Sequence, residues 1–175
     1  PTVPLYTSAL QLILKDNRLE EARRIYKKMR ELGLKPDVKL YGLLISGFGR
    51  AGKIEDALFI FKEMQGHGVS PGPVTFLCVL KSCASIGSII EGQEIHNEIV
   101  KIGVERELFI GSSLVDMYAK CCFLEEAQDV FDSISSPNRN IITWTALITG
   151  YTEHGRNEQA IECFENLQKE GTASP

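Results

Sequence analysis

The sequence has no long apolar run, no excess of basic charge and no catalytic motif, and each absence excludes a class of protein. Its apolar runs fall short of the roughly 18–20 residues that a membrane-spanning helix needs, so we expect no membrane insertion. The formal net charge of −4 argues against a basic coat for nucleic acid, but it leaves room for a local basic groove. A hydrophobic content of 43% with 24% charged residues is typical of a soluble folded domain.

Recognisable site motifs are missing as well. Five cysteines occur without C-x-x-C spacing, and this odd number favours a reducing compartment over a disulfide framework. We find no Ser–His–carboxylate set, Gly-rich phosphate loop or paired carboxylates, so we expect no enzyme activity, no cofactor and no metal. The opening segment "PTVPLYTSAL" has neither the secretory nor the transit-peptide layout, and a targeting segment of a longer protein would lie upstream of it.

What the sequence does contain is one helical pattern, repeated. The segments "LEEARRIYKKM" (19–29) and "LEEAQDVFDSI" (124–134) share four positions spaced 3, 4 and 3 residues apart, which form one stripe of an α-helix. The stripe also occurs at 54–64, 89–99 and 157–167, so that successive copies are offset by 35, 35, 35 and 33 residues. Its third position is usually aromatic and holds Tyr26, Phe61, His96, Phe131 and Phe164.

An upstream helix precedes each stripe, and a short break such as "RAGK" (50–53) separates the two helices. Glycines that accept the left-handed cap conformation are predicted to end the downstream helices at Gly33, Gly68, Gly103 and Gly171. Such a hairpin cannot bury its apolar stripes alone, so neighbouring hairpins must stack. We therefore predict an all-α fold, an α-solenoid in one array whose five repeats are 3–37, 38–72, 73–107, 108–140 and 141–175.

The second copy, "VKLYGLLISGFGRAGKIEDALFIFKEMQGHGVSP", resembles the pentatricopeptide repeat (PPR) family, and the resemblance covers nearly the whole chain. It implies a right-handed superhelix that binds single-stranded RNA, one nucleotide per repeat. The third copy is similar to the long-type variant of the family, and the 33-residue fourth copy to its short-type variant. The order P, P, L, S, P resembles the plant PLS-type subgroup, which implies RNA processing, often C-to-U editing, in chloroplast or mitochondrion.

The resemblance assigns base selection to the fifth and last residues of each repeat. The pairs are Thr7 with Asp37, Gly42 with Gly72, Leu77 with Glu107, Ser112 with Asn140, and Thr145 with an atypical Pro175. A carboxylate matches the donors of guanine and a side-chain amide matches adenine, so the first pair should prefer G and the fourth A. The second and third pairs should be permissive and Thr145 suggests a purine, which makes the expected site 5′-G-N-N-A-R-3′.

Two further sets of residues are expected to contact RNA without reading its sequence. The resemblance places the second residue of each repeat between successive bases, in a row of Pro4, Lys39, Val74, Phe109 and Ile142. Three cations lie in register near the ends of upstream helices, at Lys15, Arg50 and Lys120, and we expect them to contact phosphates. The alternative for these cations is a solvated charged face.

Two short motifs suggest metal chemistry, and packing explains both better. Cys121 and Cys122 lie at the break between helices, and by the resemblance Cys122 stands where glycine is usual. A zinc site requires four convergent donors, and other ligands are missing nearby. The segment "HNE" (96–98) matches half of a zinc deaminase signature, but the P-C-x-x-C half is missing. Because His96 occupies the aromatic position of the stripe, we expect it in the core.

A second class of function stays open, namely a scaffold whose solenoid groove or convex face binds protein. The partners implied by the resemblance are single-stranded RNA and other organellar RNA-processing proteins. Repeat arrays normally need polar caps, yet neither "PTVPLY" nor "GTASP" supplies a capping helix. We therefore expect the exposed end faces to stack end to end at high concentration.

Overall fold

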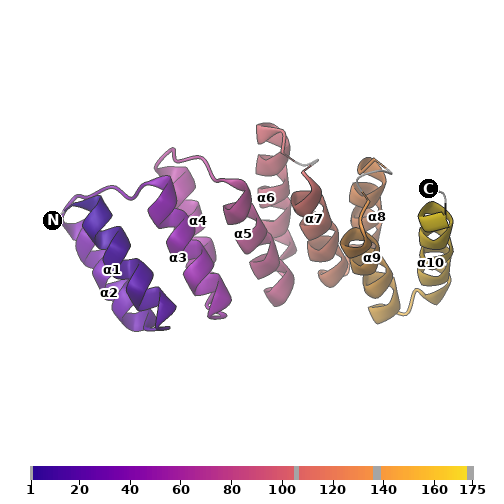
Figure 1. The fold of residues 1–175 in the computed structure, drawn as a ribbon, viewed down its shortest axis with the longest axis horizontal. Coiled ribbons are helices and arrows are strands. Elements are labelled where there is room, and N and C mark those ends of the chain that lie inside the picture. Colours follow the sequence, from indigo (N-terminus) through magenta and orange to yellow (C-terminus); the bar gives the residue numbers. More distant parts are fainter. Residues whose placement is uncertain (1, 105–106, 136–138, 173–175) are drawn as a thin grey trace. The chain divides into compact units, whose positions relative to one another are not determined.

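The computed structural model describes residues 2–104, 107–135 and 139–172, and every regular element in these segments is an α-helix (Figure 1). The helices are α1 (Val3–Lys15), α2 (Leu19–Glu31), α3 (Val38–Arg50), α4 (Ile54–Gly66), α5 (Pro73–Ile86), α6 (Ile89–Ile102), α7 (Leu108–Lys120), α8 (Leu124–Ser133), α9 (Ile141–Glu153) and α10 (Asn157–Thr172). The predicted all-α fold is confirmed. None of the described helices combines the length and the apolar composition needed to cross a bilayer.

The chain forms two compact units that divide within α5: an N-terminal unit, Pro1–Ser82, and a C-terminal unit, Cys83–Pro175. In the N-terminal unit α1 packs against both α2 and α3, and α3 packs against α4 (Figure 1). In the C-terminal unit α7 packs against α8 and α9, and α9 packs against α10. Within each unit, successive hairpins therefore stack through their first helices.

The same pair of positions joins the stacked first helices in both units. A Cβ built on Gly47 of α3 would lie 2.9 Å from Leu14 Cδ1 of α1. A Cβ built on Gly150 of α9 would lie 2.5 Å from Ala119 Cβ of α7. Gly47 and Gly150 are each the tenth residue of their predicted repeats. The backbones approach closely because these positions have no side chain, and the hairpins of each unit stack in the same register.

The predicted aromatic stripe forms part of the core of each unit. The rings of Phe61 and Phe76 lie 6.2 Å apart, and those of Phe131 and Trp144 lie 4.5 Å apart, each pair edge to face. In both pairs a stripe residue of one repeat packs on the large residue that opens the next first helix. Burying an aromatic side chain of this kind stabilises the fold by roughly 1.5–3 kcal/mol.

The predicted helix ends are confirmed at three glycines and wrong at the fourth. Left-handed φ angles of 71°, 70° and 80° occur at Gly33, Gly68 and Gly103. The residue after each of these glycines is apolar and donates its N–H to the carbonyl five residues back, as this cap requires. At the fourth, α10 continues through Gly171 to Thr172.

Candidate nucleic-acid interface

Asp37 and Asn140 occupy the same structural position, at the starts of α3 and α9. Asp37 Oδ1 accepts a hydrogen bond of 2.8 Å from Leu40 N, and Asn140 Oδ1 accepts one of 2.9 Å from Thr143 N. Each side chain thus caps its helix by satisfying one of the free N–H groups of the first turn. The cap uses one polar atom of each side chain, and neither Asp37 Oδ2 nor Asn140 Nδ2 takes part in it.

The hydroxyls paired with these residues are both buried. Thr7 Oγ1 donates to Val3 O at 2.9 Å within α1. Ser112 Oγ of α7 lies 2.7 Å from Thr143 Oγ1 of α9, and Thr143 Oγ1 donates to Asn140 Oδ1 at 2.9 Å. The structure therefore brings Ser112 and Asn140 together through a third residue that sequence reasoning missed. Its only signal in the sequence is a hydroxyl at the third position of the following repeat.

The other predicted pairs lack this arrangement. Their residues are Gly42, Gly72, Leu77, Glu107 and Thr145. Glu107 is exposed and precedes α7 without a side-chain bond to the helix start, and Thr145 donates to Ile141 O at 2.6 Å. Pro175, the predicted partner of Thr145, lies outside the described residues.

The residues expected to lie between bases are all exposed, at the starts of first helices. They are Pro4, Lys39, Val74, Phe109 and Ile142. Phe109 has 60% of its surface in contact with solvent, and Val74 has 66%. Apolar side chains of this size in water are accessible to a ligand, as a wedging role requires.

Two of the three predicted phosphate contacts share a groove. Lys15 and Arg50 are the last residues of α1 and α3, and both line a cavity of about 600 Å³ between these helices. Neither is ion-paired with a carboxylate in the described part of the chain. Lys120 ends α7 in the same way, but its Nζ lies 2.8 Å from Asp116 Oδ2, so an acidic residue one turn earlier offsets its charge.

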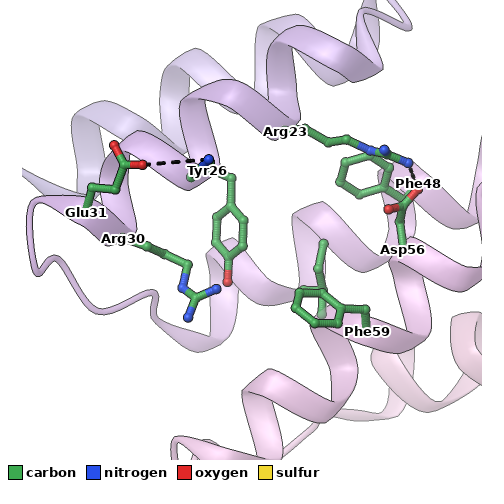
Figure 2. Close-up of a pocket in the computed structure, with 9 residues that line it drawn as sticks. Arg23, Tyr26, Arg30, Glu31, Phe48, Asp56 and Phe59 are labelled. Carbon is green, nitrogen blue, oxygen red and sulfur yellow. Dashed lines mark hydrogen bonds and ion pairs between the residues drawn. The ribbon is translucent and has the colours of Figure 1, made fainter.

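A second pocket of about 600 Å³ lies between α2 and α4, and the sequence did not predict it (Figure 2). Its cations are all paired: Arg23 with Asp56, Lys27 with Glu31 at 4.0 Å, and Arg30 with Glu63 at 2.6 Å. Phe59 contributes a largely exposed ring to the wall. With its charges neutralised, this pocket suits an apolar side chain better than a phosphate.

The adjacent cysteines occupy a turn that requires a left-handed residue. Cys122 has a φ of 66°, and Gly52, Gly87 and Gly155 have φ angles of 72°, 69° and 70° at the equivalent turns. Cys122 Sγ lies 2.8 Å from His154 Nε2, and burial raises the pKa of the Cys121 thiol. Within the described residues, no group of three His, Cys, Asp or Glu side chains gathers as a metal site would require. Cys122 thus occupies the turn position predicted for it, but its side chain is exposed and Cys121 is only half-buried, so the predicted packing role is not supported for Cys122.

His96 packs where the sequence placed it, although it is only half-buried. Its Nδ1 lies 2.8 Å from the Tyr118 hydroxyl, and the two rings meet edge to face at 5.6 Å. The ring therefore joins α6 to α7 in the position that aromatic residues take in other repeats.

The fold and this interface define a helical repeat protein. Two family models match the chain: the PPR repeat family model over residues 1–48 and 36–85, and the PPR repeat model over 74–104, 112–136 and 142–172. The chain belongs to the PPR family.

Similar proteins of Arabidopsis thaliana agree with this assignment. A putative pentatricopeptide repeat-containing protein is 34% identical over 170 residues, which are 97% of this chain and 32% of that protein. A mitochondrial relative is 36% identical over a segment that covers 98% of this chain and 26% of that protein. A chloroplastic relative is 30% identical over a segment that covers 94% of this chain and 19% of that protein. The chain thus spans at most about a third of these relatives.

Solved structures show the same fold. The pentatricopeptide repeat protein PPR10, in complex with an 18-nt psaJ RNA element, matches 98% of this chain and 26% of its own with a TM-score of 0.70 at 18% identity. The PPR domain of Arabidopsis thaliana protein-only RNase P 1, in complex with tRNA, matches 95% of this chain and 89% of its own with a TM-score of 0.72 at 16% identity. The fold is therefore the α-solenoid of PPR proteins.

Proposed function

We propose that the chain is a sequence-selective module for single-stranded RNA, reading one nucleotide per repeat within a longer protein. The observation that carries this proposal is the equivalent placement of Asp37 and Asn140, each capping a first helix with one polar atom left over. The RNA bound to PPR10 and the tRNA bound to the protein-only RNase P domain support it.

We call the Thr7–Asp37 pair the first site and the Ser112–Asn140 pair the fourth site. Hydrogen-bond chemistry at the first site supports a preference for G. The proton of Thr7 is used by Val3 O, so its hydroxyl can only accept from a ligand, and Asp37 Oδ2 also only accepts. Two acceptors suit guanine, whose Watson–Crick edge has two neighbouring donors, N1–H and the N2 amino group. Uracil has a single donor between two carbonyls and satisfies only one of them.

The fourth site differs by one functional group. Asn140 has its oxygen engaged in the cap, which leaves its Nδ2 to donate to N1 of adenine. This modifies the sequence prediction, in which the amide itself both donated and accepted, because the amide oxygen already accepts from the N–H and the hydroxyl of Thr143. The proposed site remains 5′-G-N-N-A-R-3′.

Contacts that ignore base identity would supply much of the affinity. Phe109 is exposed for stacking, which contributes roughly 1–3 kcal/mol per base in single-strand binding proteins. Lys15 and Arg50 line the same groove, and two neighbouring cations there would attract a phosphate backbone.

Salt-dependent binding tests the proposal. Removing one phosphate-binding cation should lower the slope of log K against log salt by about 0.7, so Lys15→Gln with Arg50→Gln should lower it by about 1.4. The matched control is Arg24→Gln with Lys28→Gln, which removes two exposed charges from α2 outside the groove. The proposal fails if the chain binds no RNA at low salt, or if both double variants change the slope equally.

The lengths of the copies support a finer assignment to the plant PLS-type subgroup. We infer a role in organellar RNA processing, of which C-to-U editing is the specific candidate, in chloroplast or mitochondrion with other processing proteins. Relatives named as mitochondrial and chloroplastic support the organellar part. Selection of RNA from a random pool, matched to organellar transcripts, would test the assignment. If the selected RNAs match no sequence upstream of edited cytidines, the editing role is contradicted.

The pocket between α2 and α4 favours the alternative, a protein-binding scaffold. Protein binding there should tolerate the double change at Lys15 and Arg50 but be lost in Phe59→Asp, because a carboxylate in an apolar contact costs desolvation. RNA binding should show the opposite response to the two changes.

A further inference from the structure

We propose that Cys122 and His154 form a reactive thiol–imidazole pair, through which Cys122 exchanges with small disulfides and takes up a reversible modification. The pair joins the turn after α7 to the end of α9, and both lie in the C-terminal unit. The chemistry of the pair does not depend on RNA binding.

The imidazole of His154 is held by hydrogen bonds at both ring nitrogens. Its Nδ1 lies 2.8 Å from Gly150 O, one turn earlier in α9, and a carbonyl only accepts, so Nδ1 carries a proton. In the neutral ring Nε2 is then the nitrogen without a proton, and it lies 2.8 Å from Cys122 Sγ. The Cys122 thiol therefore donates to Nε2, and His154 is placed to take its proton.

A nucleophile beside a base that a third group orients is the arrangement that activates nucleophiles in proteins. Here Gly150 O orients the ring, His154 receives the proton and Cys122 becomes the thiolate. The imidazolium that forms is the C-cap residue of α9, where the carbonyls of a helix end favour a positive charge. Because the thiolate, and not the thiol, attacks disulfides, the pair supplies the reactive form.

Cys122 is also the one cysteine that a reagent can reach easily. Of the five cysteines, all in the described part of the chain, only Cys122 is exposed. Cys83 is buried, and burial raises the pKa of the Cys78 and Cys121 thiols and raises that of Cys163 to about 11. Since burial lowers both access and the thiolate fraction, a small disulfide should modify Cys122 first.

The neighbouring Cys121 provides an internal reference. Its Sγ donates to Cys83 O of α5 at 4.0 Å, whereas Cys122 Sγ contacts His154 at the end of α9. The two sulfurs therefore face different helices. A carbonyl can accept a hydrogen bond from Cys121 but does not take its proton, so the two thiols should differ in reactivity.

The pairing is specific to one turn of the array. Cys122 is the fifteenth residue of its repeat and His154 is the fourteenth residue of the next. The equivalent pairs of positions hold Asn17 with Ala51, Gly52 with Ile86, and Gly87 with Cys121. None of these combines a thiol with an imidazole, so the reactive pair belongs to the fourth and fifth repeats alone.

The exchange balances with the disulfide as its only co-reactant. The Cys122 proton passes to His154 Nε2, the thiolate attacks one sulfur of the disulfide R–S–S–R, and a Cys122–S–S–R bond forms as the R–S–S–R bond breaks. The leaving thiolate takes the proton from the imidazolium and departs as R–SH. The Cys122 sulfur is oxidised and the leaving sulfur is reduced, so an excess of thiol reverses the step.

The experiment treats the folded chain with 2-hydroxyethyl disulfide at neutral pH and follows the intact mass after acid quenching. We expect one rapid adduct in the wild type and in Cys121→Ser, its removal by added thiol, and no rapid adduct in Cys122→Ser. A first adduct that still forms rapidly in Cys122→Ser would overturn the proposal.

The role of the base is tested by His154→Gln, because an amide cannot take the proton. Exchange at Cys122 should slow by about ten- to thirtyfold, since an unassisted thiol reacts only through the few per cent of thiolate present at neutral pH. His67→Gln makes the same change at the histidine that caps the end of α4 and should leave the rate unchanged. Equal rates at Cys122 in the wild type and in His154→Gln would overturn the proposal.

A comparison that needs no variant guards against a change of fold. In urea the wild-type thiols lose their native neighbours, and their mean rate of exchange is the unassisted rate. Native Cys122 should exceed that rate by about ten- to thirtyfold at the same pH. A native rate at or below the rate in urea would also overturn the proposal.

Discussion

At the scale of single residues, backbone conformation at the turn between helices is decided by one position in each repeat. Gly52, Gly87 and Gly155 hold left-handed φ angles there, whereas Asn17 and Cys122 do so at 57° and 66°. Asparagine tolerates this region better than most residues, and cysteine has no such advantage. Cys122 therefore carries backbone strain that its contact with His154 partly offsets.

Replacing Cys122 by glycine should raise the free energy of unfolding by up to about 1 kcal/mol, because glycine adopts positive φ without steric cost. The matched change is Gly155→Ala, where a Cβ would meet no atom within 4 Å, so only backbone strain is added. It should lower the free energy of unfolding by about 1 kcal/mol. Urea denaturation of both variants measures the difference. Stabilisation by Gly155→Ala would contradict the conformational explanation.

The Asp37→Asn variant should shift the first-base preference from G toward A. An asparagine can keep the cap to Leu40 N, as Asn140 keeps its own, so the change alters the ligand-facing atom and leaves the helix start intact. Competition binding against the four possible first bases should show the preference for G fall by about three- to tenfold. An unchanged order of preference would refute the assignment of Asp37 to the first base.

At the scale of helices, glycines set how closely neighbouring first helices approach. Gly150→Ala should lower the free energy of unfolding by about 1–3 kcal/mol, because its Cβ would stand 2.5 Å from Ala119 Cβ. Gly49→Ala is the control, since its Cβ would meet Ser82 Oγ at an ordinary 3.7 Å. It should stabilise α3 by up to about 1 kcal/mol through helix propensity. Thermal or urea unfolding that ranks the two variants in the reverse order would contradict this packing.

At the scale of the whole molecule, the expected end-to-end association of the chain can be tested on α10. Phe164 is 51% exposed, whereas Phe61 and Phe131 in the same position of earlier repeats are 3% and 2% exposed. We predict a concentration-dependent rise in mass by sedimentation, suppressed in Phe164→Lys because a charge would be buried at the contact. Glu165→Lys, an exposed change on the same helix, is the control for added positive charge. A strictly monomeric profile of the wild type at high concentration would contradict the prediction.

The extent of agreement between sequence and structure follows from which interactions are local. The stripe positions, the helices and the glycine caps at Gly33, Gly68 and Gly103 were predictable because each depends on residues within a few positions in the chain. The prediction at Gly171 is wrong, since α10 extends to Thr172, and a glycine alone does not end a helix. The repeat register alone groups Lys120 with Lys15 and Arg50. Asp116 lies one turn before Lys120 in the same helix, and its carboxylate offsets the Lys120 charge.

The sequence by itself determined that the chain is an all-α repeat protein and which residues stand at equivalent positions, because periodicity is a property of the chain alone. Only the tertiary structure decided that Lys15 and Arg50 share a groove and that the cations between α2 and α4 are neutralised. It alone placed Thr143 between Ser112 and Asn140. Hydrogen bonds and ion pairs between residues about 30 positions apart depend on how hairpins stack, and no local pattern records which atoms then meet.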